Sequence, residues 1–324
     1  MKKFVVFVAL IAAMFMIVTA CSSQSTGSFP NKNIEFIAPA SPGGGWDATA
    51  RAMQKILSDE GLIKDDIVVV NKPGGGGEVG WTYLKEKDAH SLAINSSLVL
   101  TNNILGKSKL TYEQFTPIAI LATEWQAIAV AKDSEIKSAS EMMKKLKENP
   151  KSLKIAVAPS LGNDDHLSFV QAAKTFGVDV TKLDFLIYES GGDVVTALLG
   201  KHVDIATMSV SEAKEQYLAG KFRILAVSSD ERLKGLEDIP TWKDEGVDMV
   251  FPHWRGVMGP PNMTAEEIAY WDDKLSKMVN TDAWKKLLNN NEWDSFYKNS
   301  TETKQFLAEQ NKMYDQIITE SGLK

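Results

Sequence analysis

Two glycine-rich runs, each placed directly after a short apolar segment, constrain the fold of this chain most strongly. The first run covers residues 38–47 and follows residues 34–37, and the second covers residues 71–78 and follows residues 67–70. Short apolar segments that end at proline and glycine are typical of buried strands entering tight loops. A helical pattern follows each run, so the glycines lie at helix starts, where backbone N–H groups can bind an anion. The sequence therefore predicts one anion-binding site built from both loops.

Short apolar segments alternate with helical patterns along the rest of the chain. Strands are expected at residues 34–38, 67–70, 92–95, 118–121, 127–131, 153–158, 185–188, 205–208, 224–227 and 256–258. Helix starts are marked by capping-box patterns at Ser138 with Glu141 and at Thr264 with Glu267. This alternation is typical of an α/β protein whose parallel or mixed sheet is covered on both faces.

The order strand, glycine-containing loop and helix recurs in the second half of the chain. It is found at residues 153–166, where Asn163 is expected to cap a helix, and again at residues 185–199. Roughly 300 residues exceed one typical core, so we expect two α/β lobes that face each other across a cleft. Crossings near residues 123–127 and 252–256 would place residues 29–124 and 253–324 in lobe 1 and residues 125–252 in lobe 2.

The N-terminus predicts export. Lys2 and Lys3 precede an apolar run at residues 4–18, which is the pattern of a signal peptide over residues 1–20. The segment 18–21 resembles a bacterial lipobox, so Cys21, the single cysteine of the chain, is the expected lipidation site. Residues 21–28 would then form a flexible tether. An ordinary signal peptide with an incidental cysteine is the alternative.

Charge and missing motifs exclude several classes of function. The formal net charge is −6 and becomes more negative once Lys2 and Lys3 are removed, which argues against nucleic-acid binding. Residues 75–80 match G-x-G-x-x-G, but the next strand ends at residues 94–97 without the acidic residue that a dinucleotide site needs. There is no phosphate-binding loop with lysine and no nucleophile elbow. We therefore expect no cofactor and no catalytic residue.

Several side chains near the loops have a binding and a structural interpretation. Asp47 either contacts a ligand or caps the helix that follows it, and Ser96, Ser97 and Thr101 either donate into the cleft or face solvent. Trp46 or Trp81 lines the pocket, or both belong to the lobe core. Arg255 either binds a carboxylate with two parallel hydrogen bonds or forms an ion pair between lobes. The histidines, His90, His166, His202 and His253, show no metal-ligand spacing, and only His166 lies in a candidate binding loop. No metal site is expected.

The motifs of the mature chain resemble those of the extracytoplasmic receptors of tripartite tricarboxylate transporters, also called Bug receptors. The resemblance rests on residues 39–47, 71–77, 160–166, 188–193 and 254–261, in this order. It implies a two-lobe type II periplasmic-binding-protein fold, in which each lobe is a mixed β-sheet flanked by helices and the ligand cleft lies between the lobes. It also implies that the first-lobe loops hold a carboxylate, that the second lobe contacts the distal part of the ligand, and that the closed receptor docks on a membrane permease. Trp46 makes the first loop similar to that of citrate-type receptors.

The sequence thus predicts a lipid-anchored, extracytoplasmic, monomeric receptor for a di- or tricarboxylate such as citrate, held to the membrane through Cys21. A binding protein that reports to a sensor kinase is an alternative, and an enzyme that processes a carboxylate is another. The candidate ligand-binding residues are Ser41, Gly44, Gly45, Trp46 and Asp47; Gly74, Gly75 and Gly76; Ser96, Ser97 and Thr101; Ser160, Gly162, Asn163 and His166; Gly191, Gly192 and Asp193; and Arg255. Gly44, Gly45, Gly75 and Gly76 would supply amide donors and allow close approach of the ligand to the backbone.

Overall fold

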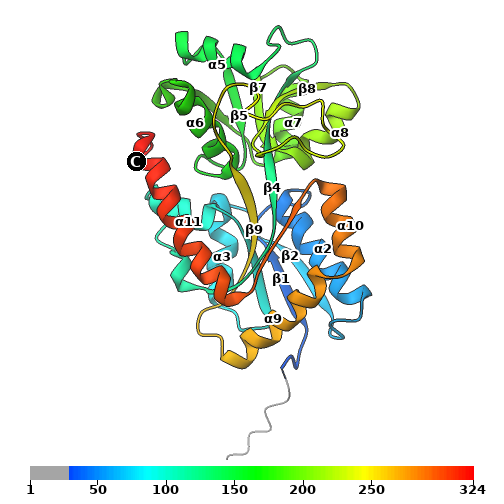
Figure 1. Ribbon diagram of the computed structural model, residues 1–324. Helices are drawn as coiled ribbons and strands as arrows, with labels where there is room; N and C mark the ends of the chain where they lie inside the picture. Colours follow the sequence, from blue (N-terminus) through cyan, green and yellow to red (C-terminus); the bar gives the residue numbers. More distant parts are fainter. Residues whose placement is uncertain (1–28) are drawn as a thin grey trace, which may run out of the picture.

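The computed structural model describes residues 29–324 of the chain. The predicted signal peptide (1–20), the lipidation site Cys21 and the tether (21–28) lie outside the described residues. Figure 1 shows two lobes stacked on one another, with two strands, β4 (Thr116–Ala131) and β9 (Pro252–Gly259), running across the junction from one lobe toward the other. The predicted two-lobe α/β architecture is confirmed.

The strands pair in one mixed, curled sheet. Its order is β2-β1-β3-β9-β4-β7-β5-β6, and β8 and β10 pair with β4 outside this path. The remaining strands are β1 (Ile34–Ala38), β2 (Ile67–Asn71), β3 (Ser91–Asn95), β5 (Lys154–Val157), β6 (Asp184–Ile187), β7 (Ile205–Ser209), β8 (Phe222–Val227) and β10 (Asp294–Lys298). In Figure 1 the lower lobe, lobe 1, contains β1, β2, β3, β9 and β10, and the upper lobe, lobe 2, contains β5 to β8.

Two strand predictions need correction. The segments 118–121 and 127–131 are not separate strands, because β4 continues unbroken through the polar residues between them. β4 pairs with β9 as far as Trp125 and with β7 from Gln126 onward, so one strand belongs to both halves of the sheet. β10 was not predicted, since its residues Asp294 and Ser295 are exposed and it lacks an apolar run.

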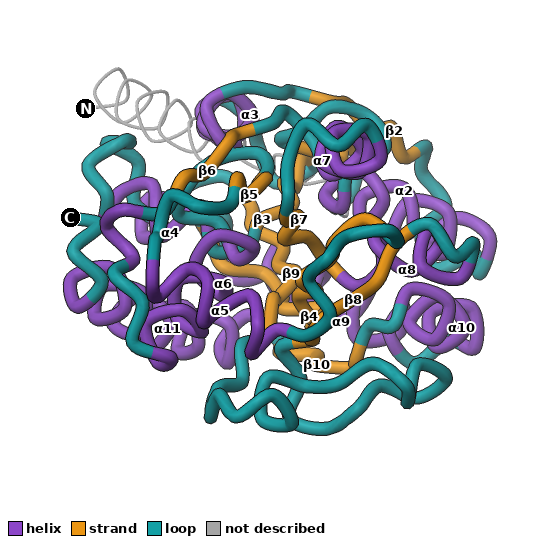
Figure 2. Tube along the Cα trace, turned by 90° about the horizontal axis from the view of Figure 1, so that it is seen from above, coloured by secondary structure: helices purple, strands orange, loops and turns teal. Residues whose placement is uncertain are grey.

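Helices cover both sides of the strands, as Figure 2 shows from above. They are α2 (Gly45–Asp59), α3 (Glu78–Lys85), α4 (Leu98–Ile104), α5 (Ala139–Glu148), α6 (Asp164–Phe176), α7 (Gly191–Leu199), α8 (Val210–Leu218), α9 (Ala265–Val279), α10 (Asp282–Asn291) and α11 (Ser300–Glu320). The predicted caps are confirmed: Ser138 accepts a hydrogen bond from Glu141 N, Thr264 forms a full capping box with Glu267, and Asn163 caps α6. In residues 29–324 we find no helix with the length and apolar character that a bilayer span requires.

Candidate functional site

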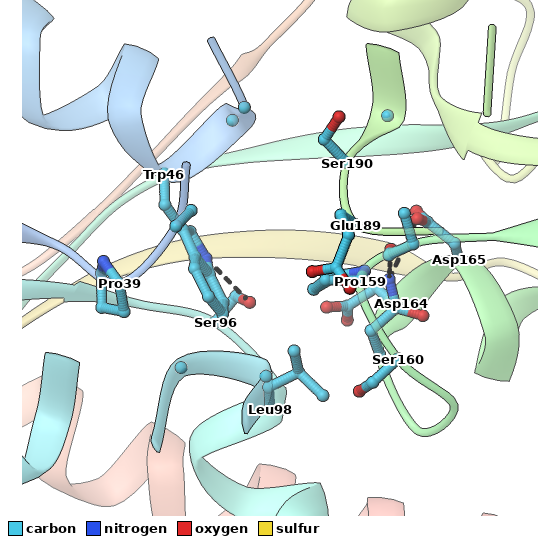
Figure 3. A pocket seen from close by; sticks show the side chains of 18 of the residues that line it. Pro39, Trp46, Ser96, Leu98, Pro159, Ser160, Asp164, Asp165, Glu189 and Ser190 are labelled. Atoms are coloured by element: carbon cyan, nitrogen blue, oxygen red, sulfur yellow. Dashed lines mark hydrogen bonds between the residues drawn. The ribbon is translucent and has the colours of Figure 1, made fainter. Parts of the chain in front are cut away.

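A cavity of about 430 Å³ lies at the junction of the lobes. Figure 3 shows its two walls: Pro39, Trp46 and Ser96 of lobe 1 face Pro159, Ser160, Asp164, Asp165, Glu189 and Ser190 of lobe 2, with Leu98 below. Strands β1, β3, β5 and β7 end at this cavity. The residue after each of β1, β3 and β5 lines it, as does the last residue of β7, so the cavity occupies the carboxyl edge of the sheet.

The structure brings most of the predicted site residues to this cavity. The predicted residues that line it are Ser41, Gly44, Gly45, Trp46, Gly74, Gly75, Gly76, Ser96, Ser160, Asn163, Gly191 and Arg255. The predicted residues that do not line it are Asp47, Ser97, Thr101, Gly162, His166, Gly192 and Asp193. Those of the second group that are buried make structural contacts behind the lining, which the following paragraphs describe.

The two glycine loops of lobe 1 present backbone N–H groups at the cavity wall. Gly44 is the N-cap of α2, with φ −80° and ψ 169°, and Gly45 opens the helix. Gly74 to Gly77 all have positive φ values between 60° and 127°, a region that side chains other than glycine avoid. Among the described residues, no hydrogen-bond acceptor is recorded for the N–H groups of Gly44, Gly45, Gly75 and Gly76. Such unpaired donors at a helix start are suited to a carboxylate.

Asp47 joins the two loops behind the cavity wall. Its Oδ1 accepts a hydrogen bond from Asn71 Nδ2 at 2.8 Å, and its Oδ2 accepts from Gly43 N at 3.0 Å and Arg51 Nε at 2.9 Å. Asn71 Nδ2 also donates to Ala40 O at 3.0 Å. The interpretation of Asp47 as helix N-cap is wrong, because Gly44 takes that position and Asp47 lies three residues further into α2. Asp47 and Asn71 therefore fix the position of one loop relative to the other.

Replacing Asn71 with alanine should lower the free energy of unfolding by about 1–3 kcal/mol, because two partly buried hydrogen bonds, to Asp47 Oδ1 and to Ala40 O, are lost. Burial alone would raise the pKa of the Asp47 carboxyl, but hydrogen bonds from Arg51, Gly43 and Asn71 outweigh burial and lower that pKa below 3.8. The stability that this carboxylate contributes is therefore present above pH 3.8 and is lost as the pH falls through the lowered value.

Urea unfolding of the wild-type and N71A proteins at a series of pH values measures this effect. The difference between them should stay constant from neutral pH to about pH 4 and narrow below it. Asn290, exposed on α10, provides the control N290A, whose stability should match the wild type within ~0.5 kcal/mol. A difference between N71A and the wild type that does not change with pH would contradict the role of Asp47.

Trp46 and Trp81 lie one behind the other in lobe 1. Trp46 lines the cavity and donates from Nε1 to Ser96 Oγ at 3.2 Å, and Trp81 is 1% exposed and donates to Ile94 O at 3.1 Å. Their ring centroids are 5.6 Å apart. Trp46 thus supplies an apolar face to the cavity, and Trp81 belongs to the lobe core.

The residues after β3 and β5 bond directly to each other across the lobes. Thr101 Oγ1 donates to Gly162 O at 2.6 Å, Lys107 Nζ donates to Leu161 O at 2.6 Å, and Ser97 Oγ donates to Asp164 Oδ2. Ser97, Thr101 and Gly162 are therefore engaged in closing one edge of the cleft. The lobes are in contact at this edge.

His166 has a structural role inside lobe 2. Its ring is 1% exposed, and its Nδ1 accepts a hydrogen bond from Gly162 N at 3.0 Å. Burial, with a smaller contribution from Lys107, lowers the pKa of His166 to about 3, so the ring is neutral at physiological pH. His166 holds the loop 159–166 in shape and does not reach the cavity.

Arg255 lines the cavity and forms an ion pair with Glu124. The two residues project from neighbouring strands, β9 and β4, and are 3% and 0% exposed. Burial lowers the pKa of Arg255 to about 9, so the guanidinium stays charged at neutral pH. A Cβ on Gly45 would lie 2.5 Å from Arg255 Nη1, so the guanidinium packs against the first glycine loop. The predicted ion pair between lobes is not what forms, because Glu124 and Arg255 lie on neighbouring strands and both belong to the segments predicted for lobe 1. Arg255 also lines the cavity, so its predicted role in binding a carboxylate stays a prediction.

Glu124 and Asp164 connect this pair to a buried polar network. Glu124 Oε2 accepts from Trp293 Nε1 at 2.8 Å and from Ser211 Oγ at 3.1 Å. His253 bridges the two carboxylates, with Nδ1 3.1 Å from Glu124 Oε1 and Nε2 3.4 Å from Asp164 Oδ2. Asp164 Oδ1 also accepts from Tyr314 OH at 3.1 Å.

Two further carboxyl groups lie on the lobe 2 wall. Asp165 Oδ2 accepts from Asn163 Nδ2 at 3.0 Å, and Glu212 Oε2 accepts from Ser209 Oγ at 3.1 Å. Burial, reinforced by the nearby Glu212 carboxylate, raises the pKa of Asp165 well above its usual range, and burial also raises the pKa of Glu212. Within residues 29–324 no group of His, Cys, Asp or Glu side chains has the arrangement of a metal site.

Sequence reasoning missed several lining residues. The charged ones are Lys107, Glu124, Asp164, Asp165, Glu189, Glu212 and His253. Glu124 and His253 lie within or next to the two segments where the chain was expected to cross between lobes, and Asp164 and Asp165 lie inside a loop already singled out. The sequence could have indicated Glu124 and His253, because a segment that crosses between two lobes lies at the cleft between them. Glu212 comes after the end of a strand that no glycine follows, so the sequence did not indicate it as a lining residue.

The fold and this cavity define a two-lobed solute-binding protein. The model of the tripartite tricarboxylate transporter family receptor matches residues 49–323, and the chain belongs to this family. Receptors of this family are extracytoplasmic solute-binding proteins and not enzymes.

Individual relatives are distant but cover most of the chain. A protein from the tcbD–tcbE intergenic region of Pseudomonas sp. strain P51 is 26% identical over 82% of this chain and 80% of its own length. A solved TctC solute-binding protein from Polaromonas is 26% identical, with TM-score 0.67 over 90% of this chain and 99% of that one. A Rhodopseudomonas palustris protein solved with adipate is 20% identical, with TM-score 0.83 over 91% of this chain and 98% of that one.

Proposed function

We propose that this chain captures a small carboxylate in the cavity between its lobes and delivers it to a tripartite tricarboxylate transporter permease. The observation that carries this proposal is the lobe 1 wall, where Gly44, Gly45, Gly75 and Gly76, whose N–H groups have no recorded acceptor, line the same cavity as the buried guanidinium of Arg255. Backbone donors suit a carboxylate because no mobile side chain has to be ordered on binding. Family membership and the adipate-bound neighbour support the same ligand class.

Closure of the lobes is the step that signals binding in this proposal. A ligand that contacts both walls gains its full set of contacts only in the closed state, so it shifts the population toward that state. We assign residues 29–124 and 253–324 to lobe 1 and residues 125–252 to lobe 2, with lipid on Cys21 holding the receptor at the outer face of the membrane. The sequence favours a di- or tricarboxylate such as citrate as the ligand.

Thermal unfolding and calorimetric titration of the purified protein with citrate, succinate, adipate, glutamate and nicotinate test the ligand class. At least one of them should raise the midpoint of unfolding, since a ligand at a hundredfold its Kd stabilises the folded state by ~2.7 kcal/mol. Methyl esters of the same acids are the control, and they should have no effect, because they lack the carboxylate. Absence of heat and of stabilisation with every carboxylate would disprove the proposal.

A further inference from the structure

We infer that the ligand carries a positively charged amino group at the end that faces lobe 2, so that the receptor prefers an amino carboxylate to a dicarboxylate of equal length. This inference rests on the proposed function, because it names the second end of a ligand whose carboxylate is held by lobe 1. It replaces the di- or tricarboxylate that the sequence favours with an amino carboxylate. It starts from the unequal distribution of charge over the two walls of the cavity.

Acidic groups dominate the lobe 2 wall. The lining side chains from this wall include Asp164, Asp165, Glu189 and Glu212, and Figure 3 shows the first three gathered opposite Trp46. The basic side chains among the described lining residues are Lys107, His253 and Arg255, and all three belong to other elements, the segment after α4 and strand β9. A second carboxylate of the ligand would therefore meet no cation on the lobe 2 wall and would face carboxylates instead.

The helix starts of lobe 2 are already occupied by carboxylates of the protein. A helix N-terminus attracts an anion, and both α6 and α7 begin at the cavity. At α6 the first turn carries Asp164 and Asp165. At α7 a Cβ on Gly191 would collide with Glu212 Oε1, so this oxygen lies directly against the first residue of the helix. At both helix starts a carboxylate of the ligand would therefore meet a carboxyl group of the protein.

The side-chain hydrogen-bond donors of Asn163, Ser190 and Ser209 on this wall already donate to acceptors of the protein. Asn163 Nδ2 donates to Ala158 O and Asp165 Oδ2, Ser190 Oγ donates to Asp193 Oδ2, and Ser209 Oγ donates to Glu212 Oε2. The amide of Gln126, oriented to satisfy its own hydrogen bonds, donates to Met208 O and to Asp165 Oδ1. Among the side chains of this wall the carboxyl oxygens remain available as acceptors when ionised, and an ammonium group with three donors complements them.

A separate observation indicates the orientation of the ligand, with its carboxylate at lobe 1 and its other end at lobe 2. Arg255 is 3% exposed and lines the cavity, and within residues 29–324 its Nε has no hydrogen-bond partner. A buried guanidinium with an unused donor is suited to a carboxylate. Together with the N–H groups of Gly44 and Gly45 it sets the carboxylate end at lobe 1, so the other end of the ligand faces Asp165 and Glu212.

The protonation behaviour of the acidic wall is consistent with a missing cation. Burial and mutual repulsion raise the pKa values of Asp165 and Glu212 in the absence of ligand. The other titratable lining groups are Glu124, Asp164, Glu189 and His253, together with Lys107 and Arg255. An ammonium group placed among them would favour the ionised carboxylates, lower both pKa values and release protons. A second carboxylate would raise these pKa values further and take up protons.

Matched ligand pairs of equal length test the inference directly: succinate with 3-aminopropanoate, glutarate with 4-aminobutanoate, and adipate with 5-aminopentanoate. In calorimetry at pH 7 we expect the best amino carboxylate to bind at least tenfold more tightly than its dicarboxylate partner. Titration in buffers of different ionisation enthalpy should show proton release. The variant E212Q should reduce the preference at least tenfold, and D165N should act in the same direction. The exposed carboxylate one turn along α8 gives the control E215Q, which should bind as the wild type does.

The outcomes separate this inference from the proposed function. If dicarboxylates bind more tightly than their amino partners and with proton uptake, the inference is overturned and the carboxylate receptor stands. An unchanged preference in both E212Q and D165N also overturns the inference. If neither member of any pair binds, and the carboxylates above also fail, the proposed function itself is wrong.

Discussion

An Arg255→Met protein is expected to lose about 3–5 kcal/mol of its free energy of unfolding, because Glu124 would remain buried without its cation. Glu124 is 0% exposed, accepts hydrogen bonds from Trp293 and Ser211, and lies 3.1 Å from His253 Nδ1, none of which replaces the fixed charge of a guanidinium. A loss of this size is a large fraction of the stability of a typical domain. Urea unfolding of the variant and the wild type measures it.

A double-mutant cycle with Glu124→Gln identifies the cause. The double variant E124Q/R255M removes both charges, so it should be more stable than the sum of the single losses indicates. The control is Arg232→Met, since Arg232 pairs with Asp244 at 2.8 Å at the surface, with the side chains 46% and 40% exposed. Removal of such an exposed pair should cost less than ~1 kcal/mol. Additive losses in the cycle would show that the Glu124–Arg255 pair does not determine the effect.

A Gly44→Val protein is expected to bind its carboxylate about 10- to 100-fold more weakly while keeping its fold. At Gly44 the backbone is extended, with φ −80°, and a Cβ would meet only Ser41 O, at 3.7 Å. The valine side chain therefore fits without backbone strain or a steric clash. It blocks the ligand's access to the N–H groups of the first loop. Loss of one or two hydrogen bonds to a charged group corresponds to ~1.5–3 kcal/mol, which is the stated change in affinity. Calorimetry with the carboxylate that stabilises the wild type most measures the change.

Gly44→Ala completes this series, because a single methyl group should weaken binding less than valine does. Both variants should unfold within ~1 kcal/mol of the wild type when no ligand is present, since glycine at an N-cap has no side-chain bond to lose. Gly75→Val is a poorer test: Gly75 has φ +60°, and a Cβ there would lie 2.9 Å from Glu78 Cβ, so valine would distort the loop itself. Undiminished affinity in Gly44→Val would remove the first loop from the binding site.

Most strands of this fold can be predicted from the sequence, because a strand that is buried on both faces consists of a short continuous run of apolar residues. β1, for example, covers the predicted residues 34–38. β4 was predicted as two strands because its middle residues Thr123, Glu124 and Gln126 are polar. They are buried all the same, since they lie where the lobes meet and not in an apolar core, and Glu124 among them lines the cavity. Local pattern cannot distinguish a polar break in a strand from a loop.

The site was predicted at the level of loops but not of side-chain directions. Spacing places Ser96, Ser97 and Thr101 after β3, but whether each faces the cavity depends on the turn into α4, and only Ser96 does. Asp47 and His166 have the chemistry of ligand contacts, yet each is buried behind the lining by bonds to a backbone N–H of its own loop. The charge asymmetry of the walls comes from residues of several elements, so it is visible only once they are folded together.

The position of β9 between β3 and β4 determines the order in which the two lobes can fold. Asn95 of β3 pairs with Gly256 of β9, whereas β5, β6 and β7 pair within residues 154–209. Contacts between residues distant in the chain form late, because a long loop has to close first. A nascent or truncated chain that ends before β9 can therefore assemble the acidic wall, but it lacks Arg255 and the strand that seats β3 against β4. Ligand binding becomes possible only after the last quarter of the chain has joined the first third.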